Sequence, residues 1–153
     1  MVNWYSEVSK NVEKIPDCIK HFNAELLQAK KECSIWGNLE KASASMPGIV
    51  EHRFNQLQQI EAILEYLNIE MRRLKSKTFK KFLENYNKKL SSRDADKYVD
   101  GDADVVDLAK IINEFALIRN GYLGITKGLD QKQWQLTNIV KLRVAGIEDA
   151  NIR

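Results

Sequence analysis

The stretch RRLKSKTFKKFLENYNKK, residues 72–89, has the residue types that bind a negatively charged partner. It contains eight Lys or Arg and a single Glu. Basic side chains that follow one another along a helix contact successive phosphates of a nucleic acid and release its counterions. A helix face that is exposed only to water has a similar composition, so this alternative stays open. The candidate nucleic-acid-binding residues are Arg72, Arg73, Lys75, Lys77, Lys80, Lys81 and Lys88.

Aromatic residues lie between these basic residues, and aromatic rings can stack on the bases of a single strand. On a helix that turns by about 100° per residue, Phe79, Phe82 and Tyr86 fall opposite most of the lysines. We therefore expect the three rings to face the protein, which leaves phosphate contact as the main mechanism. The same projection places Lys75 near the apolar edge of the helix.

Charge is concentrated in two adjoining blocks of the chain. Residues 71–97 hold ten Lys or Arg and three Asp or Glu, a balance of +7, and residues 98–108 hold four Asp and no base, a balance of −4. These two values sum to the net charge of +3, so the remaining residues are balanced. Adjoining blocks of opposite sign are typical of an interaction surface.

The acidic block was compared with a calcium-binding loop. Neither possible register places both the oxygen ligands and the glycine that an EF-hand requires. We expect residues 91–107 to form a loop instead. Asp102 or Asp104 is then expected to cap the following helix by accepting hydrogen bonds from its free N–H groups.

Residues for catalysis or metal binding do not form a recognisable pattern. The sequence has no P-loop, GxGxxG, GxSxG or HExxH motif. His21 and His52 stand apart, and neither Cys18 nor Cys33 belongs to a CxxC pair. We therefore predict a protein that is not an enzyme, with no cofactor, no metal site and reduced cysteines. No apolar run is long enough to cross a bilayer, which predicts a cytoplasmic protein that does not bind a membrane.

The elements that position the basic residues are predicted to be helices. Two prolines, seven glycines and many Lys, Leu, Glu and Ala favour an all-α fold. We expect a helix up to Pro16, a second helix over 16–39, and a turn at residues 41–48. From Ile49 onward, hydrophobic residues recur every three or four positions into the basic stretch, which predicts one long amphipathic helix.

A C-terminal helix pair is expected after the acidic residues, over about 104–127 and from about 134 onward. In the first of these helices, hydrophobic residues form three parallel rows with a spacing of seven. Packing inside one subunit or packing between subunits would each explain these rows. Gly121, Gly124 and Gly128 indicate close helix packing or a bend. The candidate oligomer-interface residues are Leu108, Ile111, Phe115, Ile118, Tyr122 and Ile125.

The predicted organisation has three parts along the chain. Residues 1–46 form an N-terminal helical extension, and residues 47–93 form a long basic helix that is the nucleic-acid-binding part. Residues 94–153 form an acidic linker and the C-terminal oligomerisation helices. The predicted assembly is a helical oligomer.

This order of features resembles the UvsY family of recombination mediators of T-even-type phages. The resemblance is carried by LKSK, residues 74–77, and by the segment ADVVDLAKIINEFALIRNGYLGITKGLDQKQWQLTNIVKLRVAG, residues 103–146. The basic element of the family implies single-strand binding by Lys75 and Lys77. A second register aligns the same element with FKKFLENY, residues 79–86, and retains Lys80, Leu83, Glu84 and Tyr86.

Membership of that family would imply a ring-forming homo-oligomer in the host cell cytoplasm. Its implied partners are single-stranded DNA, the phage recombinase and the phage single-strand-binding protein. The expected function is then a mediator of DNA recombination and repair that helps load the recombinase onto coated DNA. The alternative is a non-enzymatic helical scaffold or adaptor that binds a protein partner.

Overall fold

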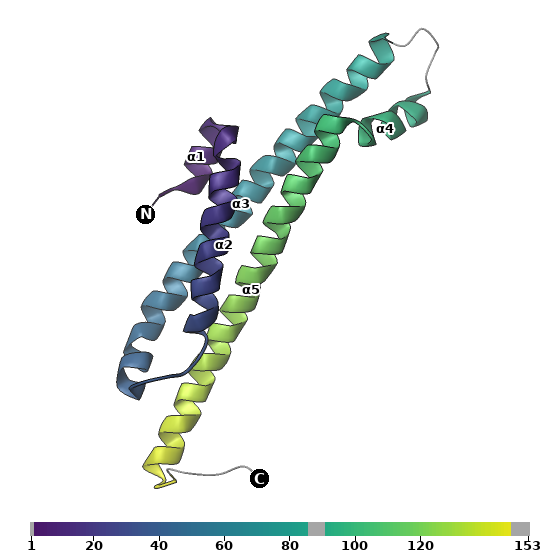
Figure 1. The fold of residues 1–153 in the computed structure, drawn as a ribbon. Coiled ribbons are helices and arrows are strands. Elements are labelled where there is room, and N and C mark those ends of the chain that lie inside the picture. The colour runs from purple at the N-terminus through teal and green to yellow at the C-terminus, as the bar shows by residue number, and fades with distance from the viewer. Residues whose placement is uncertain (1, 86–90, 148–153) are drawn as a thin grey trace.

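The computed structural model describes residues 2–85 and 91–147, and this part of the chain is all-α, with no strands. Two long helices, α3 and α5, pack side by side and run in opposite directions, and the shorter α2 lies along their middle (Figure 1). None of the described helices combines the length and the hydropathy needed to cross a membrane. The helices are α1 Trp4–Lys10, α2 Ile15–Glu32, α3 Leu39–Asn85, α4 Ser92–Asp100 and α5 Ala103–Val144, with a short 3-10 turn at Val12–Lys14.

A capping residue and a proline set the starts of the two N-terminal helices. The side chain of Asn3 accepts a hydrogen bond from the backbone N–H of Ser6 and so caps α1. Pro16 lies in the first turn of α2, where a missing N–H costs no hydrogen bond. The predicted start of the second helix at Pro16 is therefore correct to within a residue, but the first helix was predicted to reach Pro16 and ends at Lys10. The predicted end of the second helix near residue 39 is wrong, because α2 ends at Glu32 and a turn with Gly37 at φ 77° follows.

The predicted turn at residues 41–48 is also wrong. Helix α3 starts at Leu39 and continues through Pro47 without interruption. An internal proline costs a helix about 3 kcal/mol. Here Met46 is buried, and Ile49 and Val50 pack against the same cluster, which contains residues of α5. Tertiary burial on both sides of the proline thus offsets its local cost. The predicted boundary between residues 46 and 47 consequently falls inside a helix.

The predicted C-terminal helix pair is a single helix. Helix α5 covers 42 residues and passes through Gly128 and the following residues without a break. Leu129, Lys132 and Leu136 are buried on one side of it, so packing stabilises the region where the sequence suggested an end.

The predicted loop at residues 91–107 contains the helix α4. Ser91 caps this helix, because its Oγ accepts from the N–H of Asp94 and donates to the Asp94 carboxylate at 2.6 Å. The side chains of Ser91 and Asp94 therefore both stabilise the start of α4. The expected role of Asp102 is confirmed, since its carboxylate accepts from the N–H of Asp104 at 3.1 Å and caps α5.

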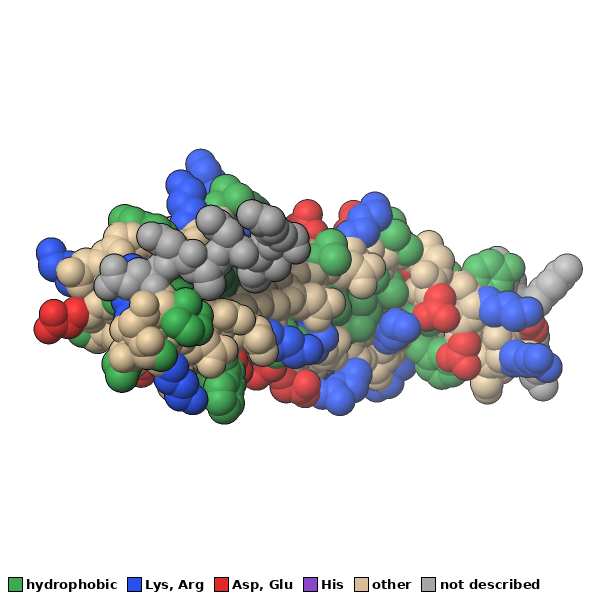
Figure 2. Space-filling model, turned by 90° about the horizontal axis from the view of Figure 1, so that it is seen from below, with side chains coloured by type: hydrophobic (Ala, Val, Ile, Leu, Met, Phe, Trp, Pro, Cys, Tyr) green, Lys and Arg blue, Asp and Glu red, His purple; other side chains and the backbone are tan. Residues whose placement is uncertain are grey.

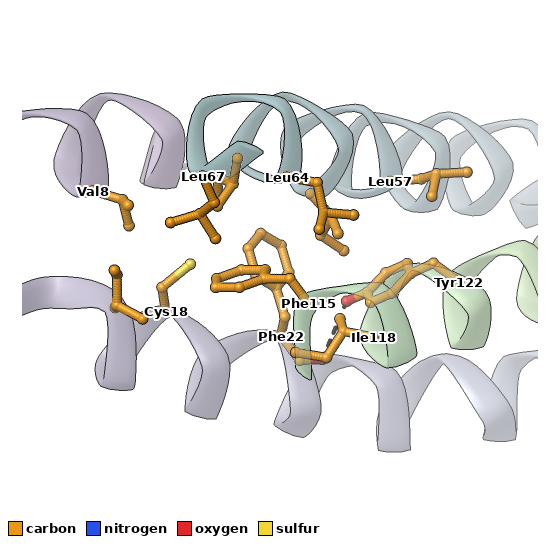
Figure 3. Close-up of a cluster of buried hydrophobic side chains, with 12 residues drawn as sticks. Val8, Cys18, Phe22, Leu57, Leu64, Leu67, Phe115, Ile118 and Tyr122 are labelled. Carbon is orange, nitrogen blue, oxygen red and sulfur yellow. Dashed lines mark hydrogen bonds between the residues drawn. The ribbon is translucent and has the colours of Figure 1, made fainter. Parts of the chain in front are cut away.

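The main core lies where α1, α2, α3 and α5 meet (Figure 3). Phe22 of α2 and Tyr122 of α5 make an edge-to-face contact, with ring centroids 6.1 Å apart. The Tyr122 hydroxyl donates to the carbonyl of Phe22 at 3.4 Å. Burial raises the pKa of the neighbouring Cys18 thiol to about 12, so that it stays protonated. The core also includes Val8, Ile15, Leu57, Ile60, Ile63, Leu64, Leu67, Phe115 and Ile118.

Two glycines of α5 let α2 approach closely. A Cβ atom at Gly121 would lie 2.7 Å from Cδ2 of Leu26, and one at Gly128 would lie 2.9 Å from Sγ of Cys33. The third glycine, Gly124, would meet nothing within 4 Å. Close packing is therefore the role of Gly121 and Gly128, as the sequence indicated, and it brings α2 against α5.

A buried arginine links α2 to α3. The side chain of Arg53 is 1% exposed and donates two hydrogen bonds to Glu32, at 2.6 and 2.7 Å. It also donates to Glu25 at 2.7 Å and to Gln56 at 2.8 Å. Burial lowers the pKa of Arg53, but the hydrogen bonds with Glu32 and Glu25 outweigh this effect and raise the pKa above its ordinary value. The predicted N-terminal extension thus folds onto the long helices.

Candidate nucleic-acid interface

The basic end of the molecule is built from the last turns of α3, from α4 and from the start of α5. Ala95 and Val99 of α4 are buried, as is Thr78 of α3. The rings of Phe82 and Tyr98 lie 5.7 Å apart between the two helices. These contacts hold α4 against the end of α3. Phe82 therefore faces the protein, as predicted, and Phe79 is half-buried, whereas Tyr86 lies outside the described residues.

Three of the candidate binding residues form ion pairs with carboxylates. Arg72 lies 3.2 Å from Glu65, and Arg73 lies 2.9 Å from Glu70. Both guanidinium groups are more than two-thirds exposed.

Lys75 has a partner that the sequence did not indicate. Its Nζ donates to Asp100, the last residue of α4, at 2.8 Å. The Lys75 side chain is 45% exposed, which agrees with its predicted place near the apolar edge.

Lys77, Lys80 and Lys81 line one shallow hollow and are exposed. Within the residues that the structure describes, none of the three forms an ion pair. Asp102 and Asp104, at the start of α5, line the same hollow, together with Glu84. The positive end of α3 thus faces the acidic block. Lys88, the last candidate, lies outside the described residues.

Away from this hollow, the surface has no preference for one sign of charge on the face seen in Figure 2. Basic and acidic side chains alternate over that face, and hydrophobic side chains are exposed between them. An extended basic track is not present there. Lys77, Lys80 and Lys81, by contrast, gather in one hollow as exposed cations that form no ion pair among the described residues.

The residues predicted to form an oligomer interface lie mostly inside one chain. Phe115, Ile118 and Tyr122 belong to the main core, and Ile125 is buried in a second cluster. The other two, Leu108 and Ile111, are half-buried and pack against the main core. In this packing the four buried side chains cannot also contact a second subunit. Oligomer formation itself stays a prediction.

Sequence reasoning missed an apolar groove between the first turns of α3 and the last turns of α5. Met46, Val50 and Phe54 line it from α3, and Leu136 and Val140 line it from α5. Phe54 is 51% exposed, although its spacing predicted a core position. On the neighbouring surface Trp134 is 68% exposed. No residue of α2 lines the groove, although α2 reaches this level, where Arg53 of α3 and Lys132 of α5 donate to Glu32. The hydrophobic spacing of residues 134–142 indicated an apolar face on this part of α5. It did not indicate that the first turns of α3 lie opposite that face.

The described residues contain no group of three or more His, Cys, Asp or Glu side chains that could hold a metal ion. The arrangement at the basic end supplies cations. Comparisons with models of protein families, with curated proteins and with solved structures find no match to this chain.

Proposed function

We propose that this protein binds single-stranded DNA through the basic end of α3 and acts as a recombination mediator. The observation that carries the proposal is the shared hollow of Lys77, Lys80 and Lys81, which are exposed and have no carboxylate partner among the described residues. Cations in this state can neutralise phosphates without first giving up an ion pair. Lys88 belongs to the same proposed site by sequence.

The three ion-paired residues also remain usable for binding. Exposed ion pairs contribute about 0–1 kcal/mol each, because water and salt screen them. A phosphate can therefore replace Glu65 at Arg72, or Glu70 at Arg73, at small cost. In the same way, a phosphate can replace Asp100 at Lys75. The proposed site thus consists of three unpaired lysines and three exchangeable cations.

Binding of this kind does not read sequence. Contacts between lysines and phosphates depend on the backbone alone. Phe82, which could stack on a base, is occupied by its contact with Tyr98. The preference for single strands is proposed from the family resemblance, as are the recombinase and the single-strand-binding protein as partners.

Fluorescence anisotropy with labelled oligo-dT tests the site. The variant K77A/K80A/K81A is expected to bind at least about tenfold more weakly than the wild type at low salt, because three phosphate contacts are lost. The control K30A/K41A/K127A removes the same charge from exposed positions elsewhere and should bind nearly as well as the wild type. Equal losses in the two variants would show that only net charge matters, and the site assignment would then be wrong.

The mediator part of the proposal needs its own experiment. Recombinase ATP hydrolysis is measured on single-stranded DNA coated with single-strand-binding protein. Adding the wild-type chain is expected to shorten the lag before hydrolysis begins, and K77A/K80A/K81A is expected to leave the lag unchanged. If the wild type binds DNA but does not shorten the lag, the protein is a DNA-binding protein without mediator activity.

We also propose that two copies associate through the apolar groove of α3 and α5. Glu51 borders the groove on α3 and Lys141 borders it on α5. A twofold axis along the groove would place α3 of one copy over α5 of the other and bring the two apolar linings together. The groove is therefore complementary to itself in hydrophobicity.

Light scattering tests this association. Phe54→Asp is expected to reduce the mass to that of a monomer, whereas Leu117→Asp, at an exposed position that does not line the groove, should leave the mass unchanged. A monomeric wild type would contradict self-association. The groove would then be free for another protein, as the scaffold or adaptor alternative predicts.

A further inference from the structure

We infer that the acidic residues between α4 and α5 act as an internal competitor for DNA at the basic end of α3. The residues are Asp100, Asp102 and Asp104. This inference rests on the proposed DNA-binding function and adds a regulation of the same site. One carboxylate occupies Lys75 and the other two lie beside the unpaired lysines, so that together they repel phosphates and lower the affinity for DNA.

The first support is the position of the carboxylates. Asp100 forms an ion pair with Lys75 at 2.8 Å, although 25 residues separate them along the chain. Asp102 and Asp104 line the hollow that also contains Lys77, Lys80 and Lys81. A strand of DNA that enters this hollow therefore meets negative charges on one of its sides.

The second support is that the carboxylates are held in place. Helix α4 is anchored by the buried Ala95 and Val99 and by the contact of Tyr98 with Phe82. The chain then turns tightly, with the N–H of Gly101 donating to the carbonyl of Lys97 at 3.3 Å. Helix α5 starts at once, capped by Asp102. Asp100 is thus held near α3 by the packing of α4, and Asp102 and Asp104 are held at the hollow by the start of α5, where Val105 is buried.

Competition of this kind has a modest expected size. Each carboxylate near the hollow repels a phosphate, and the interaction is screened because the groups are exposed. Three such groups together should lower the affinity by about five- to tenfold at low salt, with a smaller effect as salt increases. Neutralising the acids, or binding of a partner that displaces α4, is expected to raise the affinity for DNA.

A purely structural role for the acids predicts something different. Asp102 caps α5, and a capping residue stabilises its helix whether or not DNA is present. Asn caps helices about as well as Asp, so substitution to Asn retains the cap and removes the charge. If the acids serve the fold alone, these substitutions will not change DNA binding.

The experiment compares two triple variants by anisotropy with labelled oligo-dT at about 50 mM and about 200 mM salt. D100N/D102N/D104N neutralises the acid paired with Lys75 and the two acids at the hollow, and E40Q/E61Q/D130N neutralises three exposed acids elsewhere. Both variants raise the net charge from +3 by three. The control positions lie at least about 24 Å along a helix from the lysines, beyond the screening length. Circular dichroism verifies that both variants remain helical.

We expect the first variant to bind about five- to tenfold more tightly than the wild type at the lower salt concentration, and the control to change binding less than twofold. Adding K77A/K80A/K81A to the first variant should abolish the gain. Unchanged binding of D100N/D102N/D104N, or an equal gain in the control, would overturn the inference. The proposed function fails separately, if K77A/K80A/K81A in the wild-type background binds as well as the wild type.

Discussion

The middle of the molecule and its basic end use the same kinds of residues for different purposes. In the middle, Arg53 is 1% exposed and donates to Glu25, Glu32 and Gln56. At the basic end, Arg73 of the same helix is 75% exposed and has one partner, Glu70. Burial decides the role of each cation. A buried arginine is committed to the fold, and an exposed one stays available to a ligand.

The cause of this difference is the number of helices that meet. Around Arg53, α2 and α3 are both present and exclude water from the ion pairs. At the basic end the additional element is the short α4, which covers the apolar side of α3 and leaves the lysines in solvent.

The largest effect is expected from Arg53→Met. This substitution leaves the carboxylates of Glu25 and Glu32 without their main partner in a partly buried site. Loss of one member of a buried pair costs about 3–5 kcal/mol, and because both carboxylates are about a quarter exposed we expect the lower end of this range. Urea unfolding measures the change. The triple variant R53M/E25L/E32L should recover most of the stability, and a single variant as stable as the wild type would contradict a structural role for Arg53.

Substituting glycines of α5 by alanine should distinguish two effects on stability, the steric contact of the new Cβ atom and the higher helix propensity of alanine. Gly124→Ala is expected to raise the free energy of unfolding by up to about 1 kcal/mol, since its Cβ meets nothing within 4 Å. Gly121→Ala should be less stable than Gly124→Ala by about 1–3 kcal/mol, because its Cβ would lie 2.7 Å from Leu26. Thermal unfolding of the two matched variants gives the comparison. Equal stabilities would mean that α2 does not pack as closely on α5 as described.

Lowering the pH should decrease the free energy of unfolding, because Glu25 becomes protonated. The hydrogen bond from Gln56 lowers the pKa of this carboxyl, burial opposes the shift, and Arg53 lowers the pKa further. Because the folded pKa lies below the ordinary value of 4.5, the stabilisation is present above that value. It is lost as the pH falls through the folded pKa. Unfolding measured from about pH 6 to about pH 3 should show this loss, and Glu25→Gln should make the dependence shallower. An identical pH dependence in both proteins would contradict the shift.

The smallest effect on stability is expected at the basic end. Lys75→Ala removes the ion pair with Asp100, and exposed pairs contribute about 0–1 kcal/mol. We expect a change in the free energy of unfolding of no more than about 0.5 kcal/mol. A loss above about 2 kcal/mol would show that this pair holds α4 in place, and the contrast between the two regions would then be smaller than proposed.

The sequence predicted one long helix, α3, but not its start, and it predicted α5 as two helices. The apolar spacing after Ile49 predicted the greater part of α3, because a repeat of three and four is specific to an amphipathic helix. Pro47 and Gly128 suggested breaks that do not occur, since neighbouring residues gain enough burial to offset the local preference. The local sequence alone does not show how much burial these neighbouring residues gain from tertiary packing. Ser91, three residues before Asp94, is a helix-start signal, but the surrounding acidic residues and Gly101 favoured a loop.

For the candidate site, composition predicted which residues are basic and exposed, and tertiary structure decided which of them have partners. Lys75 and Asp100 meet only because α4 folds back along α3, a contact between residues 25 positions apart. No local pattern contains that information. The interface rows of α5 show the same limitation, because hydrophobic spacing cannot distinguish a partner helix of the same chain from one of another subunit. Phe115 packs against its own chain.

The salt dependence of DNA binding tests the central claim most directly. The logarithm of the affinity for oligo-dT is plotted against the logarithm of the salt concentration for the wild type and for K77A/K80A/K81A. Each phosphate neutralised on a single strand contributes about 0.7 to the slope, so loss of three lysine contacts should make the slope shallower by about 2. Parallel lines for the two proteins would contradict phosphate binding by Lys77, Lys80 and Lys81.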